Sequence, residues 1–178
     1  TCSIVNGKRP TLQIVKQSVG NRGSFDFTSS NFTGTVNVDT TSANPASSAV
    51  QTLTTAGAAT TVTETVPAGW TLASATCTGM GAGGTASLAG NVLTLNAAAT
   101  VATANIVCTF TNNKTPVVRV QKITTGGFGG PFTFTQGNLA TTPAPISTTA
   151  ANTAAPVSPA PANLVSVTGN NVTLGETF

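Results

Sequence analysis

Hydrophobic and polar residues alternate along much of the chain, which is the pattern of β-strands with one buried face. Segments rich in Val, Thr, Ile and Phe are separated by short clusters of Gly, Asn and Pro, which are turn residues. The pattern predicts strands at residues 11–17, 24–28, 35–39, 50–54, 60–66, 71–77, 91–95 and 104–111. Many short strands joined by Gly and Pro turns favour an all-β fold of the sandwich type.

Two segments have a less regular pattern. The Ala-rich stretch 96–104 has the composition of a short helical turn, but its threonines and the lack of a capping residue argue against a helix. Residues 140–163 are rich in Thr, Ala and Pro, which is typical of a flexible linker. The same composition also fits a long surface loop within a second unit, and the sequence leaves both interpretations open.

The chain contains an internal repeat. The stretch from Cys2 to Pro10 reads CSIVNGKRP, and 106 positions later the stretch from Cys108 to Pro116 reads CTFTNNKTP. The correspondence continues with Lys16 and Lys122 and, after one inserted residue, pairs Phe25, Phe27 and Asn31 with Phe132, Phe134 and Asn138. A period of about a hundred residues is a typical domain size. We therefore expect a complete β-sandwich repeat at 10–113 and a partial second repeat at 114–178. Residues 1–9 would be the trailing strand of a preceding repeat or a donor strand for a neighbouring chain.

Three polar residues fall in the apolar phase of three different predicted strands. Because residues i and i+2 share a face, each can be assigned to the side of its apolar neighbours. Lys16 follows Leu12 and Ile14, Glu64 lies between Val62 and Val66, and Asn112 follows Cys108 and Phe110.

Burying isolated charges is costly, so these three side chains are expected to meet. One interpretation is structural: a buried Lys–Glu ion pair that is hydrogen-bonded to the Asn. The other is chemical. A desolvated Lys is a neutral amine nucleophile, and a buried Glu that stays protonated can transfer protons as ammonia leaves the Asn carboxamide. The product would be a Lys–Asn isopeptide bond that joins the first and last strands of the domain.

Composition narrows the function further. The chain has 178 residues with seven Lys and Arg, four Asp and Glu, and no His, and only 6% of it is charged. Without His there is no Ser-His-Asp triad and no His-ligated metal, and the four acids are too dispersed for a calcium site. A net charge of +3 argues against nucleic acid binding, and no apolar run is long enough to span a membrane. We expect no cofactor and no enzymatic turnover, and a Thr-rich, charge-poor chain with three Cys fits an extracellular protein.

Several motifs resemble a known family. The stretch from Thr63 to Trp70, TETVPAGW, and the stretch from Cys108 to Pro116 resemble the prealbumin-like, Cna-B or SpaA-type repeat domains of bacterial surface adhesins, pilins and fibres. The resemblance implies tandem Ig-like (prealbumin-like) β-sandwich repeats. It also implies Lys16 as nucleophile, Asn112 as acceptor and Glu64 as the catalyst of autocatalytic isopeptide formation. Asn113 is a rival acceptor, but by alternation it faces the other way.

The cysteines add a second crosslink. The segment CTGMG that begins at Cys77, followed by Cys108, resembles the disulfide-bearing members of the same group. We therefore predict a disulfide between Cys77 and Cys108, the alternative being two buried free thiols. Cys2 is the repeat counterpart of Cys108, and its partner would lie in a preceding unit, so it is free or bonds to another chain.

The second unit carries some of the same residues. Lys122 is in phase with Val118 and Val120, and Glu176 shares a face with Leu174 and Phe178. Glu176 is either the counterpart of Glu64 or lies one strand earlier. The chain is then either a window from a long tandem array or one subunit of a head-to-tail polymer. In a polymer, residues 1–9 would complete the sheet of the next chain, and Lys122, Asn6, Glu176 and Cys2 are candidates for crosslinks between repeats or chains.

Together these features predict a structural module of an extracellular bacterial filament, pilus-like fibre or adhesin stalk. Its partners would be copies of itself or adjacent repeats, and a host or surface ligand is a further candidate. The competing hypothesis is a ligand-binding adhesive module that recognises a glycan or a protein. Such a module would need exposed aromatic or polar clusters on its loops.

Overall fold

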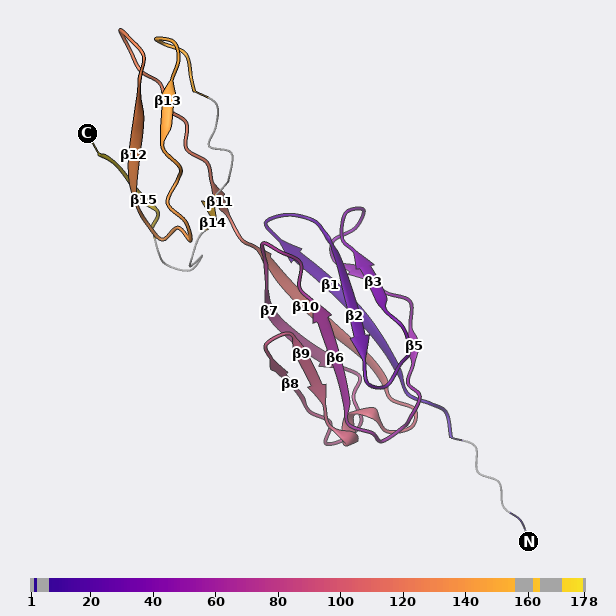
Figure 1. Cartoon of the computed structure of the whole chain (residues 1–178). Coiled ribbons are helices and arrows are strands. Elements are labelled where there is room, and N and C mark those ends of the chain that lie inside the picture. Colours follow the sequence, from indigo (N-terminus) through magenta and orange to yellow (C-terminus); the bar gives the residue numbers. More distant parts are fainter. Residues whose placement is uncertain (1, 3–6, 156–161, 164–170, 178) are drawn as a thin grey trace. The chain divides into compact units, whose positions relative to one another are not determined.

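The computed structural model describes residue 2 and residues 7–155, 162–163 and 171–177. The described residues form an all-β structure that divides into two compact units, Thr1–Lys114 and Thr115–Phe178 (Figure 1). We call them unit 1 and unit 2, and each is described by itself.

Unit 1 is a sandwich of two five-stranded sheets. The first sheet has the order β4-β1-β10-β7, with β5 also pairing with β1, and the second has the order β3-β2-β6-β9-β8. The strands are β1 (Thr11–Val19), β2 (Ser24–Ser29), β3 (Val36–Asp39), β4 (Ala46–Ser47), β5 (Gln51–Thr52), β6 (Thr60–Thr65), β7 (Trp70–Thr78), β8 (Ala86–Ala89), β9 (Val92–Leu95) and β10 (Asn105–Lys114). β-Branched residues occupy five of the six positions of β6 and four positions each of β1 and β10, as suits a pleated, half-buried surface.

The core lies between the two sheets and follows the predicted alternation. Leu12 and Ile14 of β1 are fully buried, and so are Val62 of β6 and Phe110 of β10. Aromatic contacts join the sheets, because the Phe27 ring lies edge-on to Phe110 with centroids 4.9 Å apart. The remaining buried apolar side chains in unit 1 are Phe25, Phe32, Val38, Leu53, Leu93, Leu95, Ala99, Ala104, Ile106 and Cys108.

The first and last strands of unit 1 lie side by side. β1 pairs with β10 in parallel, with Lys16 opposite Phe110 and Ser18 opposite Asn112. Since alternate residues share a face, Lys16 and Asn112 both point into the core two positions apart along the paired strands. This pairing brings together two side chains that are 96 residues apart in sequence.

Two expectations from the sequence were wrong in unit 1. Residues 96–104 do contain a helical turn, the 3-10 helix η1 (Ala97–Thr100), because Asn96 caps it by accepting a hydrogen bond from the Ala99 amide. The strand expected at 50–54 is only the two residues of β5, and β4 and β5 each pair with β1 over two residues. Strand β8, which pairs with β9 across the Gly90-Asn91 turn, was not predicted at all.

The described part of unit 2 contains one nine-residue strand, β12, and four strands of two to five residues. They are β11 (Val117–Val118), β12 (Gly129–Gly137), β13 (Ile146–Thr148), β14 (Ala162–Asn163) and β15 (Thr173–Thr177). β12 pairs with both β13 and β15, and β11 pairs with β14. The segment 140–163 thus contains β13, whose Ile146 is buried, so this part of it belongs to the folded unit rather than to a linker.

The strand registers of unit 2 repeat those of unit 1. Phe27 lies opposite Glu64, and its sequence counterpart Phe134 lies opposite Glu176. Two further pairs agree in the same way: Phe25 faces Val38 as Phe132 faces Ile146, and Leu12 faces Gln51 as Val118 faces Ala162. Of the two alignments that the sequence left open for Glu176, the register matches the one in which Glu176 corresponds to Glu64.

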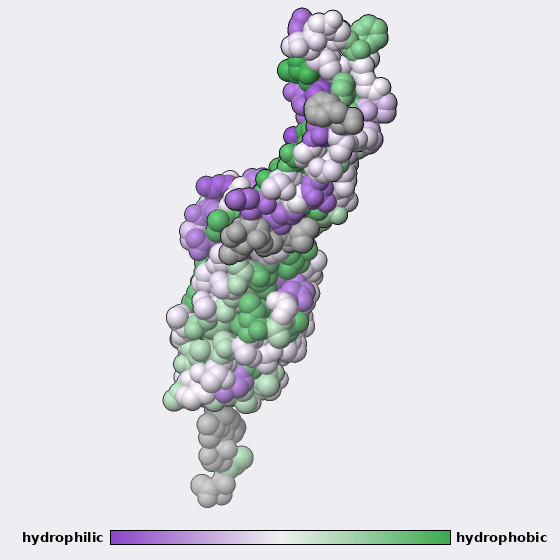
Figure 2. All heavy atoms as spheres, turned by 90° about the vertical axis from the view of Figure 1, so that its left-hand side faces the viewer, coloured by the Kyte–Doolittle hydropathy of each residue, from purple (hydrophilic) through white to green (hydrophobic). Residues whose placement is uncertain are grey.

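One side of unit 1 exposes apolar residues. Figure 2 shows a hydrophobic area over the middle of this unit, seen from the side on which β7, β8 and β9 lie in Figure 1. Leu72, Ala75, Met80, Ala86 and Leu88 are only partly buried against the core. In the described part of the chain, no helix is long and apolar enough to cross a membrane.

Candidate functional site

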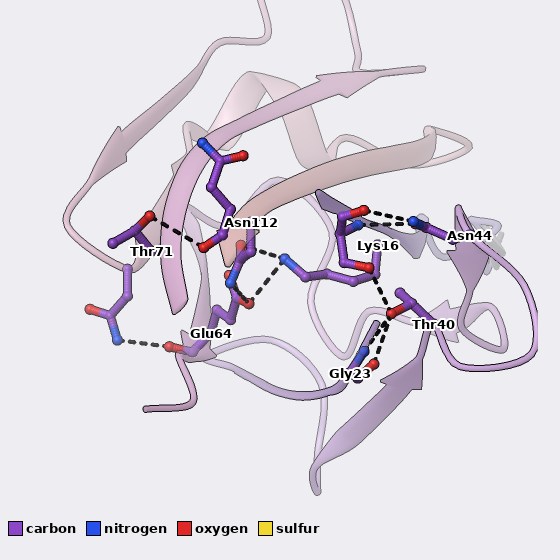
Figure 3. A network of polar contacts seen from close by, with 10 residues as sticks. Lys16, Gly23, Thr40, Asn44, Glu64, Thr71 and Asn112 are labelled. Carbon is purple, nitrogen blue, oxygen red and sulfur yellow. Dashed lines mark hydrogen bonds and ion pairs between the residues drawn. The ribbon is translucent and has the colours of Figure 1, made fainter. Parts of the chain in front are cut away.

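Lys16, Glu64 and Asn112 meet in the core of unit 1, each from a different strand (Figure 3). The Lys16 Nζ lies 2.5 Å from the carboxamide oxygen of Asn112 and 3.0 Å from Oε1 of Glu64. The Asn112 nitrogen in turn donates a hydrogen bond of 2.7 Å to the same Glu64 oxygen. β1 and β10 supply Lys16 and Asn112 from one sheet, and β6 supplies Glu64 from the opposite sheet.

Aromatic rings line the buried site. All three side chains are fully buried. The Lys16 Nζ lies 4.4 Å from the centroid of the Phe25 ring and 6.0 Å from that of Phe27. These rings hold the amine by cation–π attraction when it is charged, and they keep water away from it. Both phenylalanines come from β2, which pairs with the Glu64 strand.

Burial shifts both titratable groups toward their neutral forms. Desolvation lowers the pKa of Lys16 below the usual 10.5, and the nearby Glu64 carboxylate opposes this only in part. Desolvation likewise raises the pKa of Glu64 above 4.5, against the opposing effects of Lys16 and Asn112. Both shifts have the same main cause: desolvation moves the pKa of each group in the direction that favours its neutral form.

The remaining Glu64 oxygen has no partner. Among the described side chains, Oε2 of Glu64 is the one buried oxygen or nitrogen atom without a hydrogen bond. Buried polar atoms are nearly always hydrogen-bonded, so this oxygen is an exception to the general pattern. Glu64 therefore contacts Lys16 and Asn112 through Oε1 alone, which leaves Oε2 as a position that can carry a proton.

This arrangement is suited to amide exchange. The Lys16 Nζ donates a hydrogen bond to the side-chain oxygen of Asn112. The side-chain nitrogen of Asn112, which would leave in the reaction, donates a hydrogen bond to Glu64. A neutral amine can attack the carboxamide carbon, and Glu64 can move the proton from the attacking to the leaving nitrogen. The same groups are equally compatible with an ion pair that is bridged by an asparagine, so geometry alone admits both interpretations.

Backbone and hydroxyl contacts fix the reactive strands. Ser18 lies two residues beyond Lys16, and its hydroxyl is 2.9 Å from that of Thr40. The Asn44 side chain accepts a hydrogen bond from the Ser18 amide and donates one to the Ser18 carbonyl. Asn91 donates to the backbone carbonyl of Glu64. Figure 3 shows the Thr40 and Asn44 contacts extending the network away from the reactive side chains. Sequence reasoning missed these supporting residues because loops carry no periodic signal.

The predicted disulfide is present. Cys77 and Cys108 are directly opposite each other where β7 pairs with β10, and their sulfurs are bonded. β10 therefore carries one cysteine of the disulfide, Cys108, and also Asn112, the candidate acceptor of the isopeptide bond. Asn113 lies in the partly exposed phase of β10, as alternation predicted.

The remaining residues that the sequence predicted as crosslink sites are Cys2, Asn6, Lys122 and Glu176, and those that the structure describes lie outside the buried site of unit 1. Cys2 is an exposed free cysteine, and Asn6 lies outside the described residues. In unit 2 the Lys122 Nζ lies 2.7 Å from both carboxylate oxygens of Glu176 and 4.5 Å from the centroid of the Phe132 ring. Unit 2 therefore pairs Lys, Glu and Phe as unit 1 does, but these side chains are about one-fifth exposed.

No cluster of His, Cys, Asp and Glu among the described residues could hold a metal ion. A surface pocket of about 420 Å³ lies at one end of unit 1 and is lined by uncharged residues, namely 79–82 and 101–105. Neither feature adds a catalytic or charged group to the buried site.

Comparison with known proteins agrees with this fold. A sequence model of the SpaA type, described as a prealbumin-like fold domain, matches residues 12–114 and again residues 118–178. No curated protein and no solved structure matches the chain. Domains of this family are structural folds that are typically found on cell surfaces. The chain belongs to the family of SpaA-type prealbumin-like fold domains.

Proposed function

We propose that the chain is a load-bearing module of an extracellular bacterial filament or adhesin stalk, built from tandem repeats. In this proposal the Lys16 amine and the Asn112 carboxamide form an intramolecular isopeptide bond, with Glu64 as the proton-transfer group. The observation that carries the proposal is the fully buried contact of these three side chains across the first and last strands of unit 1.

Strand topology explains why this position matters under tension. The chain enters unit 1 at the start of β1 and leaves it at the end of β10, and the two strands are parallel neighbours. Pulling on the two ends therefore shears β1 against β10, so that the hydrogen bonds between them are loaded together. A covalent bond from Lys16 to Asn112 would carry the force directly from β1 to β10. Residues 17–111 would then bear no load.

The reaction is a balanced amide exchange that each chain performs once. The Lys16 nitrogen forms a new bond to the side-chain carbonyl carbon of Asn112, and the bond from that carbon to the amide nitrogen breaks. One proton moves from the Lys16 nitrogen to the leaving nitrogen through Glu64, and ammonia departs. The product is a neutral amide in an apolar core, so the reaction removes a buried titratable amine. No external cofactor is required.

Single-molecule extension tests the load-bearing role. The chain is held by its two ends and stretched until unit 1 unfolds. In the wild type we expect residues 17–111 to stay closed and to add no length. In Lys16→Arg we expect unfolding to release the segment outside the disulfide loop, at roughly 3.6 Å per residue.

Glu64→Gln is the second variant, because it keeps Lys16 and Asn112 and alters only the proton-transfer group. It should extend like Lys16→Arg. Equal extension of the wild type and both variants would overturn the proposal, because the covalent connection would then be absent in every chain.

A further inference from the structure

Strand β7 contains one residue more than the stretch of β10 with which it pairs. Ser74 lies opposite Thr111, and Leu72 lies opposite Asn112, so the pairing skips Ala73. An extra residue of this kind is a β-bulge, which changes the face to which the side chains beyond it point. The bulge lies at the level of Asn112, the candidate acceptor.

The bulge puts two side chains on the core face that a regular strand would place on opposite faces. Trp70 and Cys77 are seven residues apart, and in a strand with a period of two an odd separation means opposite faces. Burial follows the shift, because the successive residues Ala73 and Ser74 are both exposed. Cys77 can therefore form the disulfide while Trp70 also packs against the core.

Trp70 contacts the aromatic lining of the buried site. Its ring lies edge-on to that of Phe25, with centroids 5.1 Å apart, and the Phe25 centroid lies 4.4 Å from the Lys16 Nζ. The fit around the indole is close, because a Cβ added at Gly23 would lie 3.2 Å from a Trp70 ring carbon. The Lys114 Nζ also lies over the indole, 5.1 Å from its centroid. These contacts hold the indole beside Phe25.

We infer that Trp70 is a positioning residue for the proposed isopeptide bond and that it acts through Phe25. While the indole fixes the Phe25 ring, that ring holds the Lys16 amine at the Asn112 carboxamide. The bulge at Ala73 brings the indole to this place. The inference rests on the proposed function, because it concerns the same bond. Trp70 acts on geometry alone and takes no part in proton transfer.

A small displacement of the amine is enough to slow the reaction. The Lys16 nitrogen must lie close to the carboxamide carbon of Asn112 and in the correct orientation, and a misplacement of about 1 Å can cost on the order of a hundredfold in rate. Without the indole, the Phe25 ring has room to turn and no longer confines the amine. We therefore expect Trp70→Leu to form the bond about ten to a hundred times more slowly than the wild type.

The rate of bond formation in newly made chains tests the inference. Full-length chains are made by cell-free synthesis and denatured at successive times, and their intact masses give the fraction that has lost one ammonia, about 17 Da. Trp70→Phe keeps a ring beside Phe25 and should restore most of the wild-type rate. The matched control is Leu95→Ala, which removes a fully buried side chain opposite Thr60, at the other end of β6 from Glu64. It lowers stability but leaves the aromatic contacts, so its rate should stay near that of the wild type.

Deletion of Ala73 tests the role of the bulge. The disulfide still holds Cys77 on the core face, so the loss of one residue turns Trp70 to the outer face. Trp70 is the one tryptophan of the chain, so its fluorescence reports this change alone. In a chain that circular dichroism shows to be folded, we expect emission at longer wavelength and slower bond formation. Ala73→Ser keeps the residue count at an exposed position and should match the wild type in both measurements.

Four results would overturn the inference while the wild type still loses ammonia, which leaves the proposed function intact. A wild-type rate in Trp70→Leu means that the indole does not position the amine. Equal slowing in Trp70→Leu and Leu95→Ala means that lost stability explains the effect, and a Trp70→Phe variant as slow as Trp70→Leu means that the ring contact does not matter. Unshifted emission after deletion of Ala73 means that the bulge does not set the face of Trp70. A wild type that loses no ammonia refutes the proposed bond itself, and the inference with it.

Discussion

Lys16 and Glu64 are the only fully buried charged residues that the structure describes, and their placement is hard to explain by stability alone. A buried ion pair must repay the desolvation of both charges, and apolar replacements of similar volume are often as stable or more so. The aromatic walls of Phe25 and Phe27 offer no hydrogen bonds that would offset this cost. A reaction that turns the amine into an amide removes the problem, which is why we favour chemistry over a static pair.

The Lys16→Met variant should reveal the buried acid. Without the neighbouring amine, desolvation still holds the pKa of Glu64 above 4.5 in the folded protein. Above pH 4.5 the unfolded chain releases a proton that the folded chain keeps. The free energy of unfolding should therefore be highest below pH 4.5. It should fall as the pH rises through the raised pKa, by at most about 1.4 kcal/mol per pH unit.

Urea denaturation between pH 4 and 8 measures this slope. The matched control is Lys16→Met/Glu64→Gln, which lacks the titrating group and should show a flatter profile over the same range. Identical slopes for the two variants would mean that Glu64 titrates normally in the core.

At the scale of elements, β10 is a central strand of the first sheet of unit 1. It pairs with β1 on one side and β7 on the other, and it carries both Cys108 and Asn112 on its buried face. The disulfide fixes β10 to β7, and the proposed isopeptide bond would fix it to β1. Two edges of one strand would then be covalently held, and neither crosslink would depend on the other.

Removing the disulfide should lower the stability of unit 1. The bond closes a loop of 31 residues, and the chain-entropy model gives about 3–4 kcal/mol for such a loop. We expect Cys77→Ala/Cys108→Ala to lose about this much unfolding free energy in a denaturant titration. Cys2→Ala is the matched control, because Cys2 is exposed and unpaired, and it should leave stability unchanged. An unchanged midpoint for the double variant would contradict a stabilising disulfide.

The turn after β7 depends on a glycine. Gly79 has φ +71°, and a Cβ there would lie 1.9 Å from the Asn105 carbonyl oxygen at the start of β10. Gly34 has a similar φ of +81°, but an added Cβ there would meet no other atom within 4 Å. An alanine at position 34 therefore measures the cost of the backbone conformation without a steric clash. We expect Gly34→Ala to cost about 1–2 kcal/mol and Gly79→Ala a further 1–3 kcal/mol in thermal unfolding. Equal losses would mean that the turn and β10 can move apart freely.

Alternation explains which parts of the site could be predicted. It placed Lys16, Glu64 and Asn112 on buried faces, because a period of two is a local property of the sequence. It could not predict the Thr40 and Asn44 contacts, because these depend on how loops cross the sheet edge. The turn at η1 was missed because the capping role of Asn96 depends on a side-chain contact rather than on a pattern.

At the scale of the whole molecule, three strand pairings of unit 2 match pairings of unit 1 at the positions that the sequence correspondence predicts. The sequence match between the two units ends near Asn138, so it does not align Glu176 with a single residue of unit 1. Phe134 pairs with Glu176 as Phe27 pairs with Glu64, and this pairing aligns Glu176 with Glu64. If the two units are repeats, insertions in loops would change the sequence offset, whereas strand pairing would keep the same residues opposite each other. The two matches of one family model, at 12–114 and 118–178, fit the same organisation.

The most direct test of the central claim is the intact mass of the wild-type chain after denaturation and full reduction. The account predicts a mass about 17 Da below that of the sequence, because amide exchange releases one ammonia. Lys16→Arg and Glu64→Gln should each have the full mass of their own sequence. A wild-type chain at full mass would show that Lys16, Glu64 and Asn112 form only a buried polar network, and the covalent clamp would be refuted.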